Sequence, residues 1–159
     1  MPGHHAPLDD VDRRIVRLLL DDARMSVNDL ARRAGIGRAT AYTRIEGLQQ
    51  RGVITGFRAE VDPAAAGNPL AAYVFVDVEQ QRWTHAKAAL VQLPGLVHLT
   101  LTSGTHDAVL LVRCPDLETL RDVVLVKLHE IPEVRSAQTF FVLDEVRLAP
   151  LGPPEPGGR

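Results

Sequence analysis

The chain has 159 residues, of which 45% are hydrophobic and 24% are charged, and its formal net charge is −2 at pH 7. It can bury a sizeable core in one medium domain or two small ones. The single cysteine, Cys114, excludes an internal disulfide, and no segment has the apolar length of a signal peptide or a membrane span, so we expect a soluble cytoplasmic protein with no membrane partner.

Positive charge is concentrated in the first part of the chain. Residues 1–61 carry ten Arg and eight acidic residues, whereas residues 62–159 carry eight basic and twelve acidic residues. Within residues 30–59, six Arg stand against one acid, Glu46. Such a cluster is typical of a phosphate-binding surface and equally of a solvated helix face, so the surrounding motif has to decide.

Two short helices are predicted from apolar residues at helical spacing. Asp9 can cap the first helix, and its buried face consists of Val11, Ile15, Leu18 and Leu19. Ser26 and Asp29 form a capping box at the start of the second helix, and Gly35 supplies the left-handed residue that ends it. The inward residues of this second helix are Leu30, Ala31 and Ala34.

A third helix is predicted over residues 38–50. Its joint with the second helix identifies the motif, because Ala31 permits a close crossing and Gly35 makes a tight turn four residues later. This is the geometry of a helix-turn-helix, whose second helix enters the major groove of DNA. The sequence therefore predicts a DNA-binding domain over residues 8–62, with its reading unit at about residues 27–46.

The apolar pattern changes from helical to alternating after the third helix. Residues 53–61 are predicted to form a strand that completes a winged helix-turn-helix of three helices and one strand. Residues 63–69 are predicted to form a hinge or linker, because they combine small residues with Gly67 and Pro69.

The second half of the chain has the order strand, helix, strand, strand, helix, strand. Strands are predicted over residues 70–79, over residues 96–114 on both sides of a turn at Gly104, and over residues 133–148. The first helix is expected to bury Trp83, Ala86, Leu90 and Leu93. The second, capped by Asp116, is expected to bury Leu117, Leu120, Val124 and Leu128.

This order predicts a ferredoxin-like βαββαβ domain over residues 70–148, so the whole chain belongs to the α+β class. Helices cover one face of the antiparallel sheet. The other face needs a partner in so small a domain, and we therefore expect a homodimer. The Pro- and Gly-rich residues 149–159 are expected to be a disordered tail.

Together the two halves resemble the Lrp/AsnC family of bacterial and archaeal regulators. The resemblance covers residues 8–148 and is strongest in 8–67, in SGTHDAVLLVRCPDLETL (103–120) and in IPEVRSAQTFFVLDEV (131–146). It implies a sequence-specific regulator that pairs through its α/β domain and builds tetramers or octamers. It also implies an effector, an amino acid or a related small molecule bound between subunits, with no other cofactor, and a location at the nucleoid in the cytoplasm.

The third helix carries the residues expected to contact double-stranded DNA, and its first turns present Arg38, Ala39, Thr40, Tyr42 and Thr43. Arg38 can bind guanine through two hydrogen bonds, and the threonines can contact a thymine methyl group or a phosphate.

Two further arginines of this module are expected at the DNA interface. Arg44 matches a basic position of the family motif and is assigned to the DNA backbone, and Arg51 lies on the same module. The competing interpretation pairs Arg44 with Glu46 or with another acid of the helical bundle. Gly37 stands where family members often have a capping serine, so no hydroxyl is available there.

Residues 103–107 occupy the place where the family has a Gly, an acid, an aromatic residue and an Asp near its effector pocket. Gly104 and Asp107 match this pattern, whereas Thr105 replaces the acid and His106 replaces the aromatic residue. The missing acid removes one partner for the ammonium group of an amino acid. The same residues also suit an ordinary hairpin turn.

On the last strand, Thr139 matches a family hydroxyl and Ala137 replaces another. Thr139 is equally well interpreted as an ordinary strand residue. The effector contacts implied by the resemblance are Gly104, Thr105, His106, Asp107 and Thr139.

Nothing in the sequence indicates catalysis or a metal site. The histidines lack the spacing of metal ligands, and no pair of acids suits general acid–base work. We therefore expect no enzyme. A sirohaem-decarboxylase-like enzyme of the same architecture is the first alternative, and it is disfavoured because the α/β half is acidic. A ligand-binding module with a degenerate DNA domain is the second, and the intact helix-turn-helix disfavours it.

Overall fold

The computed structural model describes residues 7–146, 148, 152 and 153. The chain divides into two compact units between Ala59 and Glu60, and the described residues Val146, Leu148, Gly152 and Pro153 are grouped with the first unit. None of the helices in the described part of the chain is long and apolar enough to cross a membrane.

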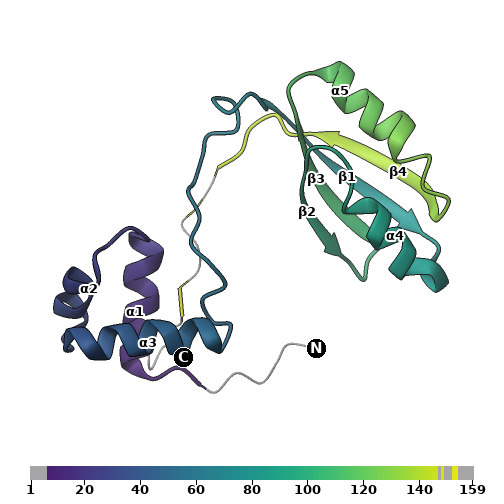
Figure 1. Ribbon diagram of the computed structural model, residues 1–159. Helices are drawn as coiled ribbons and strands as arrows, with labels where there is room; N and C mark the ends of the chain where they lie inside the picture. The colour runs from purple at the N-terminus through teal and green to yellow at the C-terminus, as the bar shows by residue number, and fades with distance from the viewer. Residues whose placement is uncertain (1–6, 147, 149–151, 154–159) are drawn as a thin grey trace. The chain divides into compact units, whose positions relative to one another are not determined.

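The first unit consists of three helices (Figure 1): α1 (Asp10–Asp21), α2 (Val27–Ala34) and α3 (Arg38–Gln50). The Asp9 carboxylate caps α1 and accepts a hydrogen bond from the backbone N–H of Asp12 at 2.7 Å. Ser26 caps α2 in the same way, accepting from the N–H of Asp29 at 3.1 Å. Gly35 ends α2 with a φ of +70°. The predicted helices, caps and turn are confirmed.

The core of the first unit gathers one apolar stripe from each helix. Its buried members are Ile15, Leu30, Ala31, Ala34, Ala41 and Leu48. The predicted face of α1 is confirmed, because Val11, Leu18 and Leu19 pack against this core around Ile15. In α3 the buried residues are Ala41 and Leu48, so one side of this helix is fixed inward and the opposite side is left to solvent.

The strand predicted over residues 53–61 is wrong. Residues 55–61 form no strand, and the apolar side chains of Phe57 and Val61 are about half exposed. A strand exists only as part of a hydrogen-bonded ladder, and the described residues offer this segment no partner. The predicted linker instead contains a compact turn, in which the N–H of Asn68 donates to the carbonyl of Pro63 at 2.7 Å.

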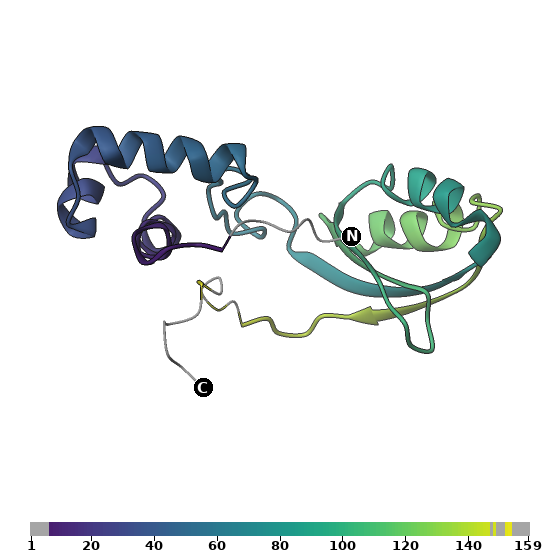
Figure 2. The same cartoon turned by 90° about the horizontal axis from the view of Figure 1, so that it is seen from below.

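The second unit is a four-stranded antiparallel sheet with the order β2-β3-β1-β4. Its elements are β1 (Leu70–Val78), a 3-10 turn (Gln80–Arg82), α4 (Trp83–Leu90), β2 (Leu96–Leu101), β3 (Ala108–Cys114), α5 (Leu117–Asp122), a π turn (Val123–Lys127) and β4 (Val134–Phe141). Figure 2 shows both helices on the same side of the sheet. The ferredoxin-like topology predicted from the element order is therefore confirmed.

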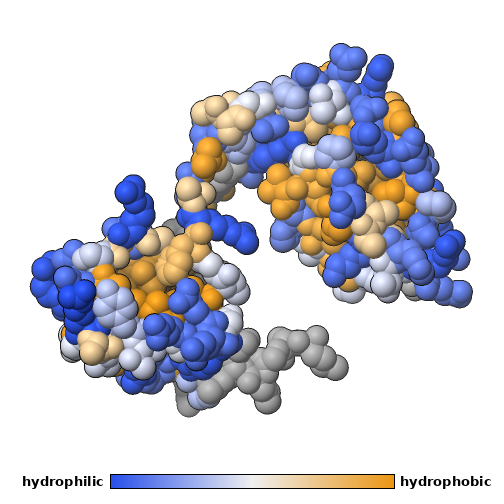
Figure 3. All heavy atoms as spheres, in the orientation of Figure 1, coloured by the Kyte–Doolittle hydropathy of each residue, from blue (hydrophilic) through white to orange (hydrophobic). Residues whose placement is uncertain are grey.

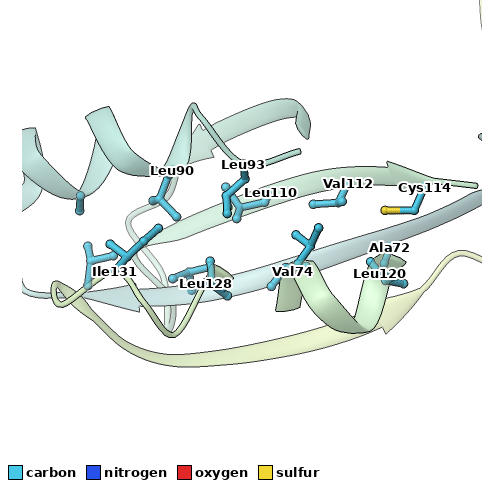
Figure 4. Close-up of a cluster of buried hydrophobic side chains, with 14 residues drawn as sticks. Ala72, Val74, Leu90, Leu93, Leu110, Val112, Cys114, Leu120, Leu128 and Ile131 are labelled. Atoms are coloured by element: carbon cyan, nitrogen blue, oxygen red, sulfur yellow. The ribbon is translucent and has the colours of Figure 1, made fainter. Parts of the chain in front are cut away.

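The core of the second unit lies between the sheet and its two helices (Figure 4). Alternate residues of β1 point into it, from Ala72 to Val78, and each is at most 1% exposed. Leu90 and Leu93 come from the α4 side, while Leu120 and Leu128 come from the α5 side. Figure 3 shows apolar side chains bordered by polar ones on the visible face of each unit.

The second helix differs from its predicted register. Leu117 is 59% exposed, whereas Val124 packs partly buried against the core and its neighbour Val123 is fully buried. Leu117 precedes and Val123 begins the π turn that continues α5, and this turn affects only the spacing beyond them: Val123 and Leu128 are both buried five residues apart, and the N–H of Leu128 donates to the carbonyl of Val123 at 2.9 Å. Leu120 and Leu128 are buried as predicted.

The last strand is shorter than the predicted 133–148. β4 ends at Phe141, which pairs with Ala72 near the start of β1, and the last bond of the ladder joins the N–H of Val142 to the carbonyl of Ala71. Beyond that point no further pair joins β4 to β1, and Leu143 is 97% exposed.

The tail predicted over residues 149–159 lies largely outside the described residues. Only Gly152 and Pro153 are described, and the carbonyl of Pro153 accepts a hydrogen bond from Nη2 of Arg17 in α1 at 3.1 Å.

Candidate nucleic-acid interface and ligand pocket

The outward side of α3 carries the five residues predicted at its first turns. All five are exposed, because Ala41 and Leu48 turn the opposite side of the helix into the core. They are Arg38, Ala39, Thr40, Tyr42 and Thr43. The helix-turn-helix thus brings this predicted group onto one accessible surface.

Two contacts within α3 order this surface. The guanidinium of Arg38 lies over the ring of Tyr42, 5.6 Å from its centroid, as in a cation–π contact. The hydroxyl of Thr43 donates to the carbonyl of Ala39 at 3.2 Å. Gly37 caps α3 without a side-chain hydrogen bond, as its lack of a hydroxyl requires.

Arg44 and Arg51 have a different setting, because both are half-buried and paired with acids of the first helix. Nη1 of Arg44 donates to the carboxylates of Asp9 and Asp12, in the second case at 3.0 Å. Nη2 of Arg51 donates to the other oxygen of Asp12 at 2.6 Å. The ion pair that competed with a phosphate contact is therefore present, with Asp9 and Asp12 in place of Glu46.

The charges of this cluster stabilise one another. The N–H of Asp12 and the Arg44 guanidinium lower the pKa of the Asp9 carboxyl below its usual value. The hydrogen bonds that Arg44 donates to Asp9 and Asp12 raise the pKa of Arg44 in turn. No local sequence signal predicts this cluster, because its acids and its arginines are more than thirty residues apart.

A separate polar depression of about 470 Å³ lies at one end of the sheet in the second unit. It is lined by the end of β1, the β2–β3 hairpin and the start of β4, through Asp77, Gly104, Thr105, Asp107, Arg135 and Ser136. Three of the five predicted effector residues, Gly104, Thr105 and Asp107, therefore lie together.

His106 belongs to the same group through its ring, although it does not line the depression. Its Nδ1 lies 3.0 Å from Oδ1 of Asp77, and the hydroxyl of Ser136 donates to the other oxygen of that carboxylate. The Ser136 hydroxyl and, after it, His106 lower the pKa of Asp77.

Asp107 and Arg135 form the second charged pair at the depression. The Asp107 carboxylate accepts the N–H of Val78 at 2.9 Å, and Nη2 of Arg135 lies 3.6 Å from the same oxygen. Both signs of charge therefore meet at one open, polar site.

Thr139 is not brought to this depression. It pairs with Val74, which points into the core, so the two side chains share the helix-covered face of the sheet. Sequence reasoning missed Asp77, Arg135 and Ser136. Asp77 had a signal, as the one charged residue in the apolar strand β1.

The face of the sheet without helices carries aromatic side chains. Phe75 and Phe140 meet edge to face with ring centroids 5.2 Å apart, and Phe75 also touches the ring of His106. Tyr73 and Phe140 are 41% and 54% exposed. This aromatic face and the polar depression lie next to each other.

Comparison with known proteins covers both units. Residues 8–55 match a winged helix-turn-helix DNA-binding model, and residues 71–150 match the Lrp/AsnC ligand binding domain. The chain belongs to the Lrp/AsnC family. It is a DNA-binding transcriptional regulator with a ligand-binding domain.

Relatives match this regulator over most of their length. An uncharacterized helix-turn-helix-type transcriptional regulator of Pyrococcus abyssi is 34% identical over 85% of this chain and 85% of its own. The transcriptional regulator AldR of Mycobacterium tuberculosis is also 34% identical, over 89% of this chain and 81% of its own. The structure of Escherichia coli AsnC has a TM-score of 0.85 and 27% identity, and it covers 93% of this chain and all of that one.

Within the part of the Lrp/AsnC chain that the structure describes, no group of three or more His, Cys, Asp or Glu residues is placed to hold a metal ion. Cys114 is buried, and burial raises the pKa of its thiol, which keeps it in the unreactive protonated form.

Proposed function

We propose that this Lrp/AsnC regulator binds operator DNA as a homodimer or a larger assembly, with α3 of each subunit in the major groove. Half-sites would then be about one helical turn apart, or a multiple of one turn. The observation that carries the proposal is the exposed side of α3. Arg38 reads a base, and Ala39, Thr40, Tyr42 and Thr43 complete the contact with bases and phosphates.

Arg44 and Arg51 contribute to DNA binding chiefly by holding α3 in place. Each guanidinium already has an acid partner within 3.0 Å, and a phosphate contact has to compete with that partner. The positive field of the two arginines at the DNA is correspondingly reduced by Asp9 and Asp12.

The aromatic face of the sheet is the surface through which two copies pair. An exposed apolar patch on a small domain is a common interaction site, and Tyr73, Phe75 and Phe140 provide one here. Pairs of this kind assemble further into tetramers or octamers.

The depression at the end of the sheet binds the effector, an amino acid or a related small molecule. Arg135 can pair with a carboxylate, and Asp77 and Asp107 can accept hydrogen bonds from an ammonium group. Thr105 adds a hydroxyl, and the ring of His106 holds the Asp77 carboxylate in place. Because the depression adjoins the pairing face, effector binding shifts the assembly and with it the DNA affinity.

On this proposal the protein acts by binding and not as an enzyme, and it works at the nucleoid in the cytoplasm. A fluorescence-anisotropy titration against the DNA upstream of its own gene tests it, in moderate salt and with random-sequence competitor. Tight, competitor-resistant binding supports the proposal. Equal affinity for the random duplex contradicts it.

A further inference from the structure

Asp12 is a charged residue in a buried position. Its side chain is 4% exposed, and both carboxylate oxygens are occupied by guanidinium groups, Oδ1 by Arg44 at 3.0 Å and Oδ2 by Arg51 at 2.6 Å. Carboxylates are rarely buried in proteins unless they are paired in this way. Asp12 therefore serves a purpose that depends on its two partners.

The two partners attach Asp12 to the recognition helix at two points. Arg44 lies in the middle of α3 and Arg51 directly follows it, so the points are seven residues apart, or about 10 Å along the axis at 1.5 Å per residue. Asp9 reinforces the first point, because its carboxylate caps α1 and accepts from Arg44 as well. The single Asp12 carboxylate of α1 thus binds one residue in the middle of α3 and one just past its end.

These ion pairs supply the directional contacts that the apolar packing of α3 lacks. Ala41 and Leu48 are the fully buried residues of this helix and Ile45 packs partly buried beside them, but apolar packing is not directional. Charge-assisted hydrogen bonds have defined lengths and angles. They fix the rotation of α3 about its axis, and that rotation decides which side chains face a DNA groove.

We propose that Asp12 is a positioning residue for DNA recognition, which holds α3 through Arg44 and Arg51 in the orientation that presents Arg38 and Tyr42 to the bases. The inference rests on the proposed function of α3 as the reading helix. Buried ion pairs contribute little net stability compared with an apolar replacement, and fixing a single arrangement is their better-attested role.

The expected effect of replacing Asp12 on DNA affinity is opposite in sign to the effect of its charge alone. Replacing an acid near a DNA-binding surface by a neutral residue should strengthen binding, because DNA is a polyanion. If Asp12 positions α3, its replacement instead weakens binding to the preferred sequence. Binding to other sequences depends on charge alone and is preserved.

The experiment compares Asp12→Asn with Asp10→Asn in the full-length protein. Asp10 is exposed in the first turn of α1, so the control removes the same charge from the same helix. The probes are a duplex selected from random-sequence DNA by the wild-type protein and a scrambled duplex of equal length. For Asp12→Asn we expect roughly tenfold or greater loss of affinity for the selected duplex, the size of one base contact, and a change below about twofold for the scrambled one.

The control is expected to bind both duplexes as tightly as the wild type or slightly more tightly. Unchanged or stronger binding of the selected duplex by Asp12→Asn overturns the inference. Loss of affinity for both duplexes in proportion also overturns it, because a role in overall folding would give that result. A wild-type protein that prefers neither duplex refutes the proposed function itself.

A second variant keeps the test decisive if Asp12→Asn does not fold, which circular dichroism reveals. Arg51→Lys retains the charge but loses the planar fork that fits the Asp12 carboxylate. We expect it to lose part of the preference for the selected duplex while keeping its affinity for the scrambled one. An unchanged preference in this folded variant contradicts the inference.

Discussion

Nη2 of Arg51, just beyond the end of α3, donates to Oδ2 of Asp12 in α1 at 2.6 Å. The same carboxylate holds Arg44, and in α2 Arg32 pairs with Asp29 at 2.6 Å. Half of the six arginines in residues 30–59 therefore have acid partners within the bundle. The positive surface available to DNA is smaller than the sequence implied.

The first prediction concerns the salt dependence of DNA binding by Arg44→Gln. Each phosphate contact adds about 0.9 to the slope of log affinity against log salt concentration. We expect the slope to remain unchanged, since Arg44 is engaged by Asp9 and Asp12. Anisotropy titrations at several salt concentrations measure it, and a slope lower by about one unit would assign Arg44 to a phosphate instead.

The second prediction concerns base recognition by Arg38. Replacing it by Ala removes an exposed guanidinium stacked on Tyr42, and we expect a loss of about 1–3 kcal/mol at one position of the operator, with relaxed preference there. Competition among duplexes that differ at single base pairs measures this preference. The matched control is Arg32→Ala, an exposed arginine of α2 that pairs with Asp29. A uniform loss at all positions would argue for a phosphate contact.

The third prediction is a pH dependence that arises from Asp9. Its folded pKa lies below its usual value, first because of the Asp12 N–H and then because of Arg44. The stabilisation is therefore complete above about pH 4, near the unfolded pKa, and is lost as the pH falls through the folded pKa. Asp9→Asn keeps a capping side chain and removes the charge.

Thermal melts followed by circular dichroism should show Asp9→Asn less stable than the wild type at pH 7. That difference should begin to shrink below about pH 4, where the unfolded chain takes up the proton, and should be lost once the pH is below the lowered pKa of the folded Asp9 carboxyl. Asp21→Asn, at the exposed end of α1, is the control. A difference that is constant from pH 7 to pH 2 would show that the charge of Asp9 stabilises nothing.

The fourth prediction places the dimer interface on the aromatic face. Phe140→Glu puts a charge beside Phe75, and we expect the dimer dissociation constant to rise roughly thirtyfold or more, as for a central interface residue. Sedimentation equilibrium measures this constant. Leu143→Glu is the control, since Leu143 lies just beyond β4 and is 97% exposed. Equal dimer dissociation constants for the two variants would show that the interface is not on this face.

The fifth prediction concerns the effector. Amino acids added singly should include one that raises the melting temperature of the wild type, and Arg135→Gln should weaken that ligand by roughly tenfold, the value of a charge-assisted hydrogen bond. Arg121→Gln, on α5 across the sheet, removes an equal charge elsewhere. If Arg135→Gln responds like the wild type, the effector binds at another place.

The helices of the first unit could be predicted because their signals are local. Ser26 and Asp29 are three residues apart, and Gly35 needs only its own backbone to stop a helix. The partners of Arg44 could not be chosen in the same way. Asp9 and Asp12 reach it only after the chain has folded through α2, so the sequence predicts an acid partner without identifying which acid it is.

In the second unit, too, some features can be predicted from the sequence and others cannot. The order of strands and helices predicts its topology, since few arrangements of this order are possible. The register between strands is a tertiary property, and it decides that Ser136 and not Thr139 stands beside Asp77. The strand predicted at residues 53–61 failed for a related reason, because alternation describes side chains and a ladder needs a second strand.

Operator recognition by α3 can be measured directly by selecting bound duplexes from a random-sequence pool with the full-length protein and sequencing them. We expect enrichment of two half-sites about one helical turn apart, or a multiple of it, with loss of the enriched bases for Arg38→Ala. A pool that remains random after repeated rounds, with binding that disappears at moderate salt, would contradict this expectation.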